Sequence, residues 1–296
     1  MNDSTAPPAG RSIVGILVAV TIAAATAWAG SDGGLSAAAF PAFAALALVA
    51  FAIQWLAFIP AYIFQTERYY DLVGSLTYLT TAALALSVKG DARSQLLALL
   101  IAVWAVRLGS FLFLRIRADG RDQRFDRIKP YAFRFLMTWT LQGLWVLMTA
   151  GAALAAMTSG LSRPLGVWAY AGALLWITGF VFEAVADAQK RRFRGDPANA
   201  GRFIDRGLWA WCRHPNYFGE ILLWCGIALI AAPTLQGWQH VTLISPLFVY
   251  LLLTRISGVP MLDRIARKRW GSEADYQAYR EATPVLLPRP PRRRSA

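Results

Sequence analysis

The residues GRFIDRGLWAWCRHPNYFGEILLWCGIAL, at positions 201–229, change from a polar, basic segment to an apolar helix. At the junction, five polar side chains fall within eight residues: Arg213, His214, Asn216, Tyr217 and Glu220. A simple anchor helix needs only Lys or Arg and an aromatic residue where it enters a bilayer. The additional hydrogen-bonding groups and the titratable imidazole therefore indicate that something polar is held at the membrane surface.

The composition around this junction is that of an integral membrane protein. Hydrophobic residues make up 56% of the 296 positions and charged residues 16%, whereas a soluble domain averages about 25% charged residues. Apolar segments lie at about 12–30, 37–64, 70–88, 95–116, 135–158, 165–187, 217–235 and 241–258. Each approaches the roughly 20 residues that a helix needs to cross hydrocarbon, and the first is too long for the apolar part of a signal peptide. We therefore expect an all-α, polytopic bundle of about eight transmembrane helices.

The distribution of positive charge predicts the orientation of this bundle. With eight spans both termini lie on one side, and 27 of the 30 Lys and Arg residues fall on that side, all except Lys89, Arg93 and Arg163. Basic residues are retained in the cytoplasm, so we expect both termini to be cytoplasmic, in a bacterial inner membrane. Topology and contact with anionic membrane lipids explain the net charge of +13. A nucleic-acid partner is not expected, because the aromatic residues lie in the spans rather than among the basic residues.

A second cluster of polar residues ends the sixth apolar segment. In FEAVADAQKRRFR, residues 182–194, Glu183 and Asp187 are four positions apart and share a helix face, which Arg191 and Arg194 extend. Carboxylates accept hydrogen bonds from ribose hydroxyl or amide groups, and arginine forks onto phosphates. The pattern suits a nucleotide cofactor. The alternative is a helix end capped with cations and stabilised by Glu–Arg pairs.

A third cluster stands at the mouth of the third span. In QTERYYDLVGSLTY, residues 65–78, Glu67 and Asp71 are again four positions apart, and Tyr70 and Tyr78 supply phenolic donors. A carboxyl group partly buried at a membrane edge has a raised pKa and can stay protonated as a hydrogen-bond donor. The alternative is an interfacial aromatic belt.

Arg107 lies well inside the fourth span, where a guanidinium needs a partner such as a cofactor phosphate, unless it snorkels to the interface. The sequence contains no Ser-His-Asp or Cys-His arrangement, and Cys212 and Cys225 fit no zinc spacing, so no metal is expected. Reactions whose difficult step is carried by a bound cofactor are therefore favoured.

These motifs resemble those of a known family. From about Glu67 to Pro288 the chain is similar to the DUF1295 group of bacterial membrane proteins, relatives of the steroid 5α-reductases. The resemblance is carried by ERYYDLVGSLTYL, VRLGSFLFLRI, GFVFEAVADAQK, RGLWAWCRHPNYFGE and RISGVP. RHPNY is also similar to sterol C14-reductases and, more loosely, to isoprenylcysteine carboxyl methyltransferases. The implied organisation is a tail and two spans at 1–66, a reductase-like domain at 67–288 and a basic tail at 289–296, with the first span added to a seven-span core.

The resemblance implies NADPH-dependent reduction of a conjugated C=C bond in a lipid-like or steroid-like substrate that enters from the bilayer. By motif, Glu67 matches the carboxyl member of a Tyr/Glu pair that holds the substrate carbonyl. Six residues match cofactor contacts of that family: Arg107, Asp187, Arg194, Asn216, Glu220 and Arg255. Trp104 stands where steroid reductases carry the catalytic Tyr, so Tyr70, Tyr78 or a water held by Glu67 would have to serve.

Two other functions are compatible with these residues. A membrane methyltransferase that uses S-adenosylmethionine needs no proton donor, which suits Trp104, although the match to its C-terminal motif is looser. A non-catalytic lipid-binding or assembly protein is the third. Binding of NADPH to the purified protein would separate the first function from the other two.

Overall fold

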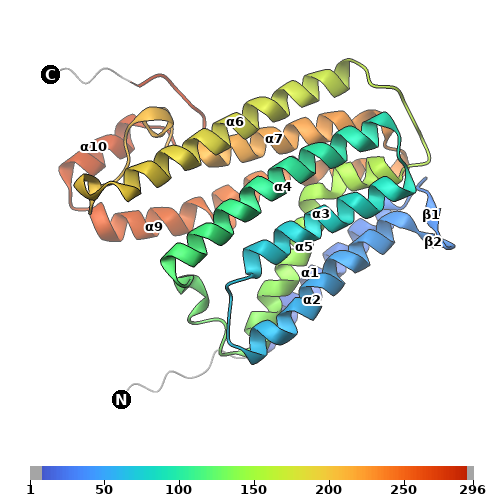
Figure 1. The fold of residues 1–296 in the computed structure, drawn as a ribbon, viewed down its shortest axis with the longest axis horizontal. Coiled ribbons are helices and arrows are strands. Elements are labelled where there is room, and N and C mark those ends of the chain that lie inside the picture. Colours follow the sequence, from blue (N-terminus) through green and yellow to red (C-terminus); the bar gives the residue numbers. More distant parts are fainter. Residues whose placement is uncertain (1–8, 292–296) are drawn as a thin grey trace. The chain divides into compact units, whose positions relative to one another are not determined.

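The computed structural model of the protein describes residues 9–291, apart from the side chains of Asp119 and Gln123, and most of this part is helical (Figure 1). The α-helices are α1 Ala9–Gly30, α2 Ala42–Ile63, α3 Tyr70–Val88, α4 Ala92–Asp119, α5 Ala132–Thr158, α6 Val167–Gly195, α7 Pro215–Ala231, α8 Ser245–Leu251, α9 Val259–Trp270 and α10 Ala274–Ala282. Two strands, β1 Ser36–Ala37 and β2 Phe40–Pro41, form a short antiparallel hairpin. The predicted all-α class is confirmed.

Within residues 9–291, eight helical segments are long and apolar enough to cross a membrane, as the sequence predicts. The eighth, Gly237–Trp270, is broken into a 3-10 helix (η5, Gly237–Ile244), α8, a π-helical turn (η6, Leu252–Ile256) and α9. Pro260, in the first turn of α9, has no backbone N–H to continue the preceding helix. The break therefore follows from the sequence RISGVP, which interrupts an otherwise apolar segment.

Helix α5 is the centre of the first compact unit, which comprises Met1–Ala169 and Ala228–Ser245. It contacts α1, α2, α3 and α4 (Figure 1). The side chains of TAGAALAAMT, residues 149–158, are all buried. Alanine and glycine let neighbouring helices approach closely, which matters in a bilayer because helix pairs gain little from burying apolar surface there. The second half of α5 therefore has the small side chains that close packing against its neighbours requires.

Two of the three basic residues predicted on the non-cytoplasmic side, the half-buried Lys89 and the buried Arg93, cap helix ends. The Lys89 ammonium donates to three backbone carbonyl oxygens at 2.9–3.1 Å, those of Ala156, Ser159 and Leu161. Arg93 is 3% exposed and donates to the carbonyl oxygens of Ile230, at the end of α7, and Pro164. The last carbonyls of a helix lack intrahelical partners and favour cations. These two charges thus stabilise the ends of α5 and α7. This structural role explains why two basic residues lie on the side of the membrane where the sequence predicts few of them.

The second compact unit comprises Tyr170–Ile227 and Pro246–Ala296. The polar segment between α6 and α7 is held against its C-terminal helices by aromatic rings. Phe203 packs on three of them, those of Trp270, Tyr276 and Tyr279. The Tyr279 hydroxyl also donates to the Trp209 carbonyl oxygen at 2.7 Å. The loop before α7 is therefore an ordered part of this unit.

In this unit α6 and α7 touch through their backbones (Figure 1). A Cβ atom on Gly179 would lie 2.5 Å from the Gly219 carbonyl oxygen, and one on Gly219 would lie 2.5 Å from the Gly179 carbonyl oxygen. A Cβ atom on Gly226, two turns further along α7, would likewise lie 2.5 Å from the Gly172 carbonyl oxygen. Only glycine fits at such distances. The contact sets the backbone of α7 against Glu183, whose amide nitrogen would lie 2.6 Å from a Cβ on Gly219.

We expect Gly219→Ala to lower the free energy of unfolding by about 1–3 kcal/mol, because the added methyl group overpacks the interface between α6 and α7. The thermal unfolding midpoint in detergent would measure the loss. Gly195→Ala is the matched control, since nothing lies within 4 Å of an added Cβ at Gly195. Equal midpoints for the two variants would contradict the role of the glycine contact.

Candidate functional site

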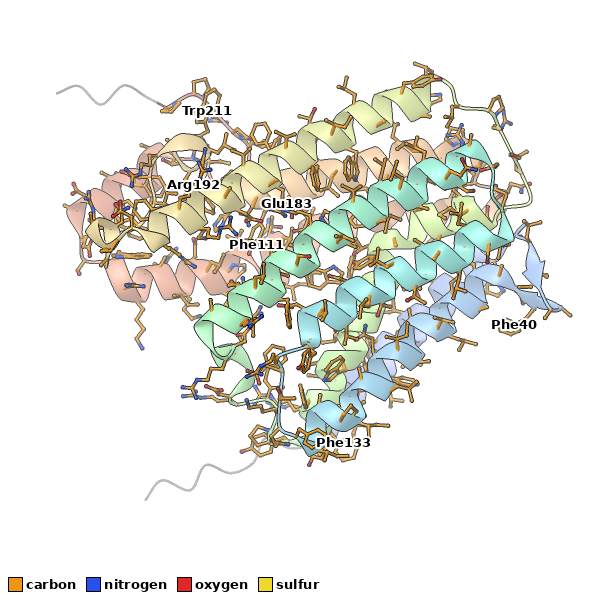
Figure 2. All side chains as sticks on the ribbon, viewed as in Figure 1. Phe40, Phe111, Phe133, Glu183, Arg192 and Trp211 are labelled. Atoms are coloured by element: carbon orange, nitrogen blue, oxygen red, sulfur yellow. The ribbon has the colours of Figure 1, made fainter. Side chains whose placement is uncertain are left out.

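The predicted carboxylate face of α6 is buried. Glu183 and Asp187 are 2% and 8% exposed. The helix continues beyond them as KRRFRG, and its three arginines, Arg191, Arg192 and Arg194, are exposed. Glu183 and Arg192 both project from the second half of the helix (Figure 2). One helix therefore presents two buried acids followed by a cluster of accessible cations.

A short 3-10 helix (η3, Gly207–Ala210) fixes the following loop on α6. The Trp209 indole N–H donates to a backbone carbonyl oxygen of α6 at 3.0 Å, and the Lys190 ammonium lies 4.3 Å from the centre of the Trp209 ring. The Gln189 side chain accepts a hydrogen bond from the Leu208 N–H at 2.9 Å. These contacts hold the block RGLWAWCRHPNY beside the charged end of α6.

The loop residues Arg213 and His214 meet an acid that the sequence did not single out. Asp263 Oδ1, on α9, lies 3.4 Å from Arg213 Nη1 and 3.9 Å from His214 Nε2. The second distance is too long for a direct hydrogen bond. The His214 ring stacks on Tyr217, with 5.3 Å between centres and 9° between planes, and a Cβ on Gly258 would lie 2.8 Å from the Tyr217 ring. Burial lowers the pKa of His214 and outweighs the opposing effect of Asp263, so the imidazole is neutral at neutral pH.

Asn216 and Glu220 lie on the protein-facing side of α7. At about 100° per residue, these two share a helix face with Leu223 and Ile227. Both apolar residues are 0% exposed, and the two polar ones are half-buried. This orientation agrees with the high cost of placing an unpaired acid against lipid.

Arg255 stands in the π-helical turn η6 of the eighth span. The Ser257 N–H donates to the Leu252 carbonyl oxygen, five residues back, at 2.9 Å. Such turns are rare and occur frequently at functional sites. The exposed Arg255 side chain is therefore displayed by a local distortion that the apolar sequence pattern did not reveal.

A cavity of about 380 Å³ opens beside the end of α6. Its polar lining includes Gln189, Asn199 and two arginines, Arg192 and Arg206. Arg206 donates to the Asn199 side-chain oxygen at 3.1 Å and lies 4.9 Å from the centre of the Phe193 ring. The sequence does not single out Arg192 and Arg206, because within a uniformly basic segment no local pattern marks which side chains share a cavity.

In the first unit, Glu67 is an ion-pair partner rather than a protonated acid. Its carboxylate is 7% exposed and accepts from the Lys129 ammonium at 2.7 Å and from the Asp122 N–H at 3.0 Å. Burial acts to raise the pKa of Glu67, but the Lys129 charge and the Asp122 amide outweigh it and lower the pKa below its ordinary value. The predicted raised pKa is therefore wrong, because the cation responsible lies 62 residues away in the sequence.

The two tyrosines predicted near Glu67 have different environments. The Tyr70 hydroxyl donates to the Thr138 carbonyl oxygen at 3.0 Å, and its ring packs on Phe125 and Trp139. Tyr78, 5% exposed, lies deeper in α3. Its ring meets that of Trp104 edge to face, with 5.1 Å between centres. Tyr78 of α3 therefore lies beside Trp104 of α4, the position at which the family resemblance leads us to expect a catalytic tyrosine.

Arg107 follows Trp104 by one turn of α4. It is half-buried, and its guanidinium carbon lies 5.6 Å from the centre of the Phe111 ring. The structure thus gathers Glu67 and Tyr70 at one end of the first unit and Tyr78 with Trp104 and Arg107 along α3 and α4. Roles for these residues in catalysis or cofactor binding stay predictions.

The chain belongs to the DUF1295 family, described as proteins of unknown function, whose family model matches residues 57–283. An uncharacterized protein of Schizosaccharomyces pombe is 28% identical over 177 residues, which cover 49% of this chain and 51% of that protein. Bovine (Bos taurus) 3-oxo-5-alpha-steroid 4-dehydrogenase 1 is 40% identical over 68 residues, 23% of this chain and 26% of the relative. A probable O-methyltransferase of Ustilaginoidea virens is 29% identical over 132 residues, 44% of this chain and 43% of the relative.

The chain thus spans about half, or less, of the length of the curated relatives that it matches. No solved structure matches it. The family resemblance inferred from the motifs is confirmed, and a stretch of the chain is similar to a steroid dehydrogenase. These relatives come from fungi and a mammal, so the expected bacterial inner membrane stays a prediction.

Because burial lowers the pKa of His214, we expect the protein to lose stability on acidification. Below about pH 6.5 the unfolded chain binds the imidazole proton and the folded chain does not, so the free energy of unfolding falls as the pH falls from that value toward the lowered folded pKa. The unfolding midpoint should therefore drop less for His214→Gln than for the wild type between about pH 7.5 and about pH 5.5. His240→Gln, which alters the only other histidine, an exposed one, should keep the wild-type drop. If the unfolding midpoint of His214→Gln fell as much as that of the wild type, His214 would not be the group responsible for the acid sensitivity.

Proposed function

We propose that the protein is a membrane reductase that uses NADPH to reduce a conjugated C=C bond in a lipid-like substrate. The observation that carries this proposal is the arrangement on α6, where Glu183 and Asp187 are buried and Arg192, one of the three arginines that follow them, lines a cavity of about 380 Å³. The similarity of part of the chain to a 3-oxo-5-alpha-steroid 4-dehydrogenase supports the class of reaction.

The donors and acceptors on α6 fit NADPH by their chemistry. Buried carboxylates accept hydrogen bonds from ribose hydroxyls and from an amide NH₂ group, and Glu183 and Asp187 offer two of them. The guanidinium groups of Arg192, Arg194 and Arg206 suit phosphate oxygens. When bound, NADPH would supply the hydride. The residues of the chain would hold the phosphates and the nicotinamide amide and exclude water.

Reduction of an enone also needs a proton. The β-carbon receives hydride, the α-carbon receives a proton, and the carbonyl is polarised by a hydrogen-bond donor. Of the three predicted donors, Glu67 is ionised by its ion pair with Lys129, and the Tyr70 hydroxyl is engaged by a backbone carbonyl. We assign the role to Tyr78, a buried phenol beside Trp104. Glu67 then has a structural role: it holds the segment between α4 and α5 through Asp122 and Lys129, and it does not donate the proton.

A methyltransferase that uses S-adenosylmethionine is the second candidate. One observation favours it: the similarity to a probable O-methyltransferase covers 44% of the chain, against 21–40% for the steroid dehydrogenases. The same α6 carboxylates would bind its ribose. However, S-adenosylmethionine carries no phosphate, so it would leave the cluster of arginines at the end of α6 without a role.

The orientation of the bundle belongs to the same proposal. If both termini are cytoplasmic, the basic end of α6 faces the compartment that holds NADPH. A reporter enzyme fused after Ala296 would be active in the cytoplasm in that case, and activity on the opposite side of the membrane would exclude both the orientation and the cofactor.

We expect Arg192→Ala and Arg194→Ala to weaken NADPH binding about tenfold or more, since each removes a charge-assisted contact of about 1.5–3 kcal/mol. Titration calorimetry on the detergent-solubilised protein would measure the dissociation constants for NADPH, NADH and S-adenosylmethionine. A larger loss for NADPH than for NADH would place the arginine at the 2′-phosphate, and equal losses would place it at the pyrophosphate. Arg264→Ala, which removes an exposed charge from α9, should leave all three constants unchanged. Binding of S-adenosylmethionine but not of NADPH by the wild type would replace the reductase by the methyltransferase.

We expect Tyr78→Phe to lower turnover of an enone lipid by about 10²–10⁴-fold, because it removes the proposed proton donor and keeps the ring. The affinity for NADPH should not change. Consumption of NADPH with a 3-oxo-Δ4 steroid and with fatty enones would measure the rate. Tyr70→Phe is the matched control and should retain most of the turnover. A similar loss in both variants would remove Tyr78 from this role, and a wild type that consumes NADPH with no enone would overturn the reductase itself.

A further inference from the structure

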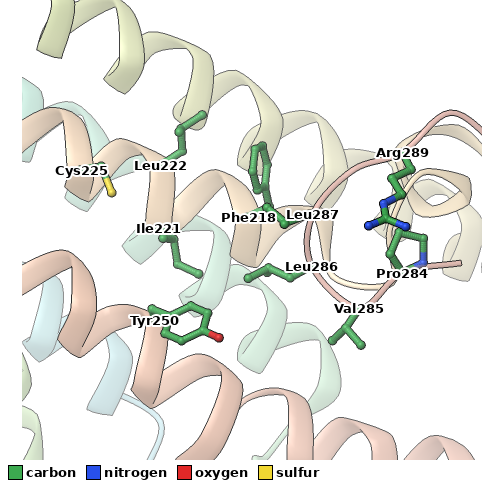
Figure 3. A pocket seen from close by; sticks show the side chains of 10 residues that line it. All are labelled: Phe218, Ile221, Leu222, Cys225, Tyr250, Pro284, Val285, Leu286, Leu287 and Arg289. Atoms are coloured by element: carbon green, nitrogen blue, oxygen red, sulfur yellow. The ribbon is translucent and has the colours of Figure 1, made fainter.

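A second cavity in the same unit lies against a different face of α7. Its volume is about 450 Å³, within the range of about 300–1,000 Å³ that ligand pockets occupy. Four α7 side chains, those of Phe218, Ile221, Leu222 and Cys225, form one wall, and Tyr250 of α8 faces them (Figure 3). The chain after α10, residues 284–289, closes the cavity on another side.

This cavity is separate from the proposed cofactor site. At about 100° per residue, Phe218, Ile221, Leu222 and Cys225 point to one side of α7. Asn216 and Glu220 point to the opposite side, together with the fully buried Leu223. The two faces of α7 therefore line different surroundings, and a ligand of the cavity would differ from a ligand of the cofactor site.

The C-terminal wall of the cavity is an ordered strap. The Arg213 N–H donates to the Pro284 carbonyl oxygen at 2.9 Å, and the Arg289 N–H donates to the Trp211 carbonyl oxygen at 3.0 Å. Between these two anchors runs VLL, residues 285–287. Of these apolar residues, Val285 is 39% and Leu287 is 64% exposed. Apolar side chains held in such positions by backbone hydrogen bonds are suited to contact hydrocarbon.

The charge in the cavity is at one end. Arg289 is the only charged residue among those that line it, and the Tyr250 hydroxyl is the other polar group besides the Cys225 thiol. Arg289 is tied to the polar loop before α7, whereas Cys225 lies deep in the apolar span. The cavity therefore runs from a cation at the membrane surface to an apolar end within the bilayer, which matches an amphiphile with an anionic head and a hydrocarbon tail.

We propose that this cavity binds an anionic phospholipid, with one acyl chain along α7 and the phosphate against Arg289. The bound lipid covers the exposed Leu287 and fastens the strap of residues 284–289 to α7. This is a site for a membrane component and is independent of the reductase proposal.

The test uses the full-length protein in a neutral detergent, titrated with phosphatidylglycerol or with phosphatidylcholine of identical acyl chains. Native mass spectrometry would count bound lipids, and the unfolding midpoint would report stabilisation. We expect the wild type to bind phosphatidylglycerol about tenfold more tightly than phosphatidylcholine, because the positive charge of choline offsets the phosphate charge that Arg289 contacts and the neutral glycerol does not. Inorganic phosphate should neither compete nor stabilise, because it lacks the acyl chain. Equal affinity for the two lipids, or displacement by phosphate, would overturn the proposal.

Two variants locate the site. Ile221→Trp fills the cavity and should abolish the bound lipid, and Arg289→Gln should remove the preference for phosphatidylglycerol while leaving the fold intact, because Arg289 is exposed. Leu174→Trp, on an exposed apolar position of α6, and Arg264→Gln are matched controls that should bind as the wild type does. Wild-type lipid binding in Ile221→Trp, or an unchanged preference in Arg289→Gln, would exclude this cavity. Arg289→Gln decides the matter if Ile221→Trp does not fold.

Discussion

The backbone contact between α6 and α7 is the constraint on which the candidate site depends. In a bilayer, two helices gain little by burying apolar side chains against each other, so close packing has to supply the attraction. Gly179 and Gly219 allow it, since each would place a Cβ atom 2.5 Å from the carbonyl oxygen of the other. This close approach of the two backbones places the buried acid Glu183 beside the polar first turns of α7. Without this approach, the acids of α6 and the block RHPNYFGE would not share one surface.

Ionic groups have two different uses in the two units. In the first unit they are bonded to the protein itself: Lys89 and Arg93 cap helix ends, and Lys129 neutralises Glu67. Each arrangement satisfies a charge or a carbonyl group that would be costly to bury alone. In the second unit the three arginines that follow Asp187 on α6 are exposed, and Arg192 lines a cavity. Burial thus separates structural charges from those accessible to a ligand, a distinction that residue type alone does not make.

Helix α7 joins the two proposals for this unit. Its protein-facing side carries Asn216 and Glu220, which are predicted to contact the cofactor, and its other side lines an apolar cavity closed by the strap of residues 284–289. Both surfaces begin at the loop that contains Arg213, which is bonded to Asp263 and to the strap. A lipid on one side and a nucleotide on the other would therefore contact the same short element without competing for the same residues.

The sequence by itself determined the eight apolar segments, the all-α class and the shared face of Glu183 and Asp187. These are local properties: a bilayer requires every backbone group to be paired within its own helix, and helical periodicity places residues four apart together. Only the tertiary structure decided which charges meet. The pair of Glu67 with Lys129 and that of Arg213 with Asp263 join residues 62 and 50 positions apart. Because the pKa of a buried acid depends on its nearest cation, the sequence indicated a protonated Glu67 where the folded chain keeps it ionised.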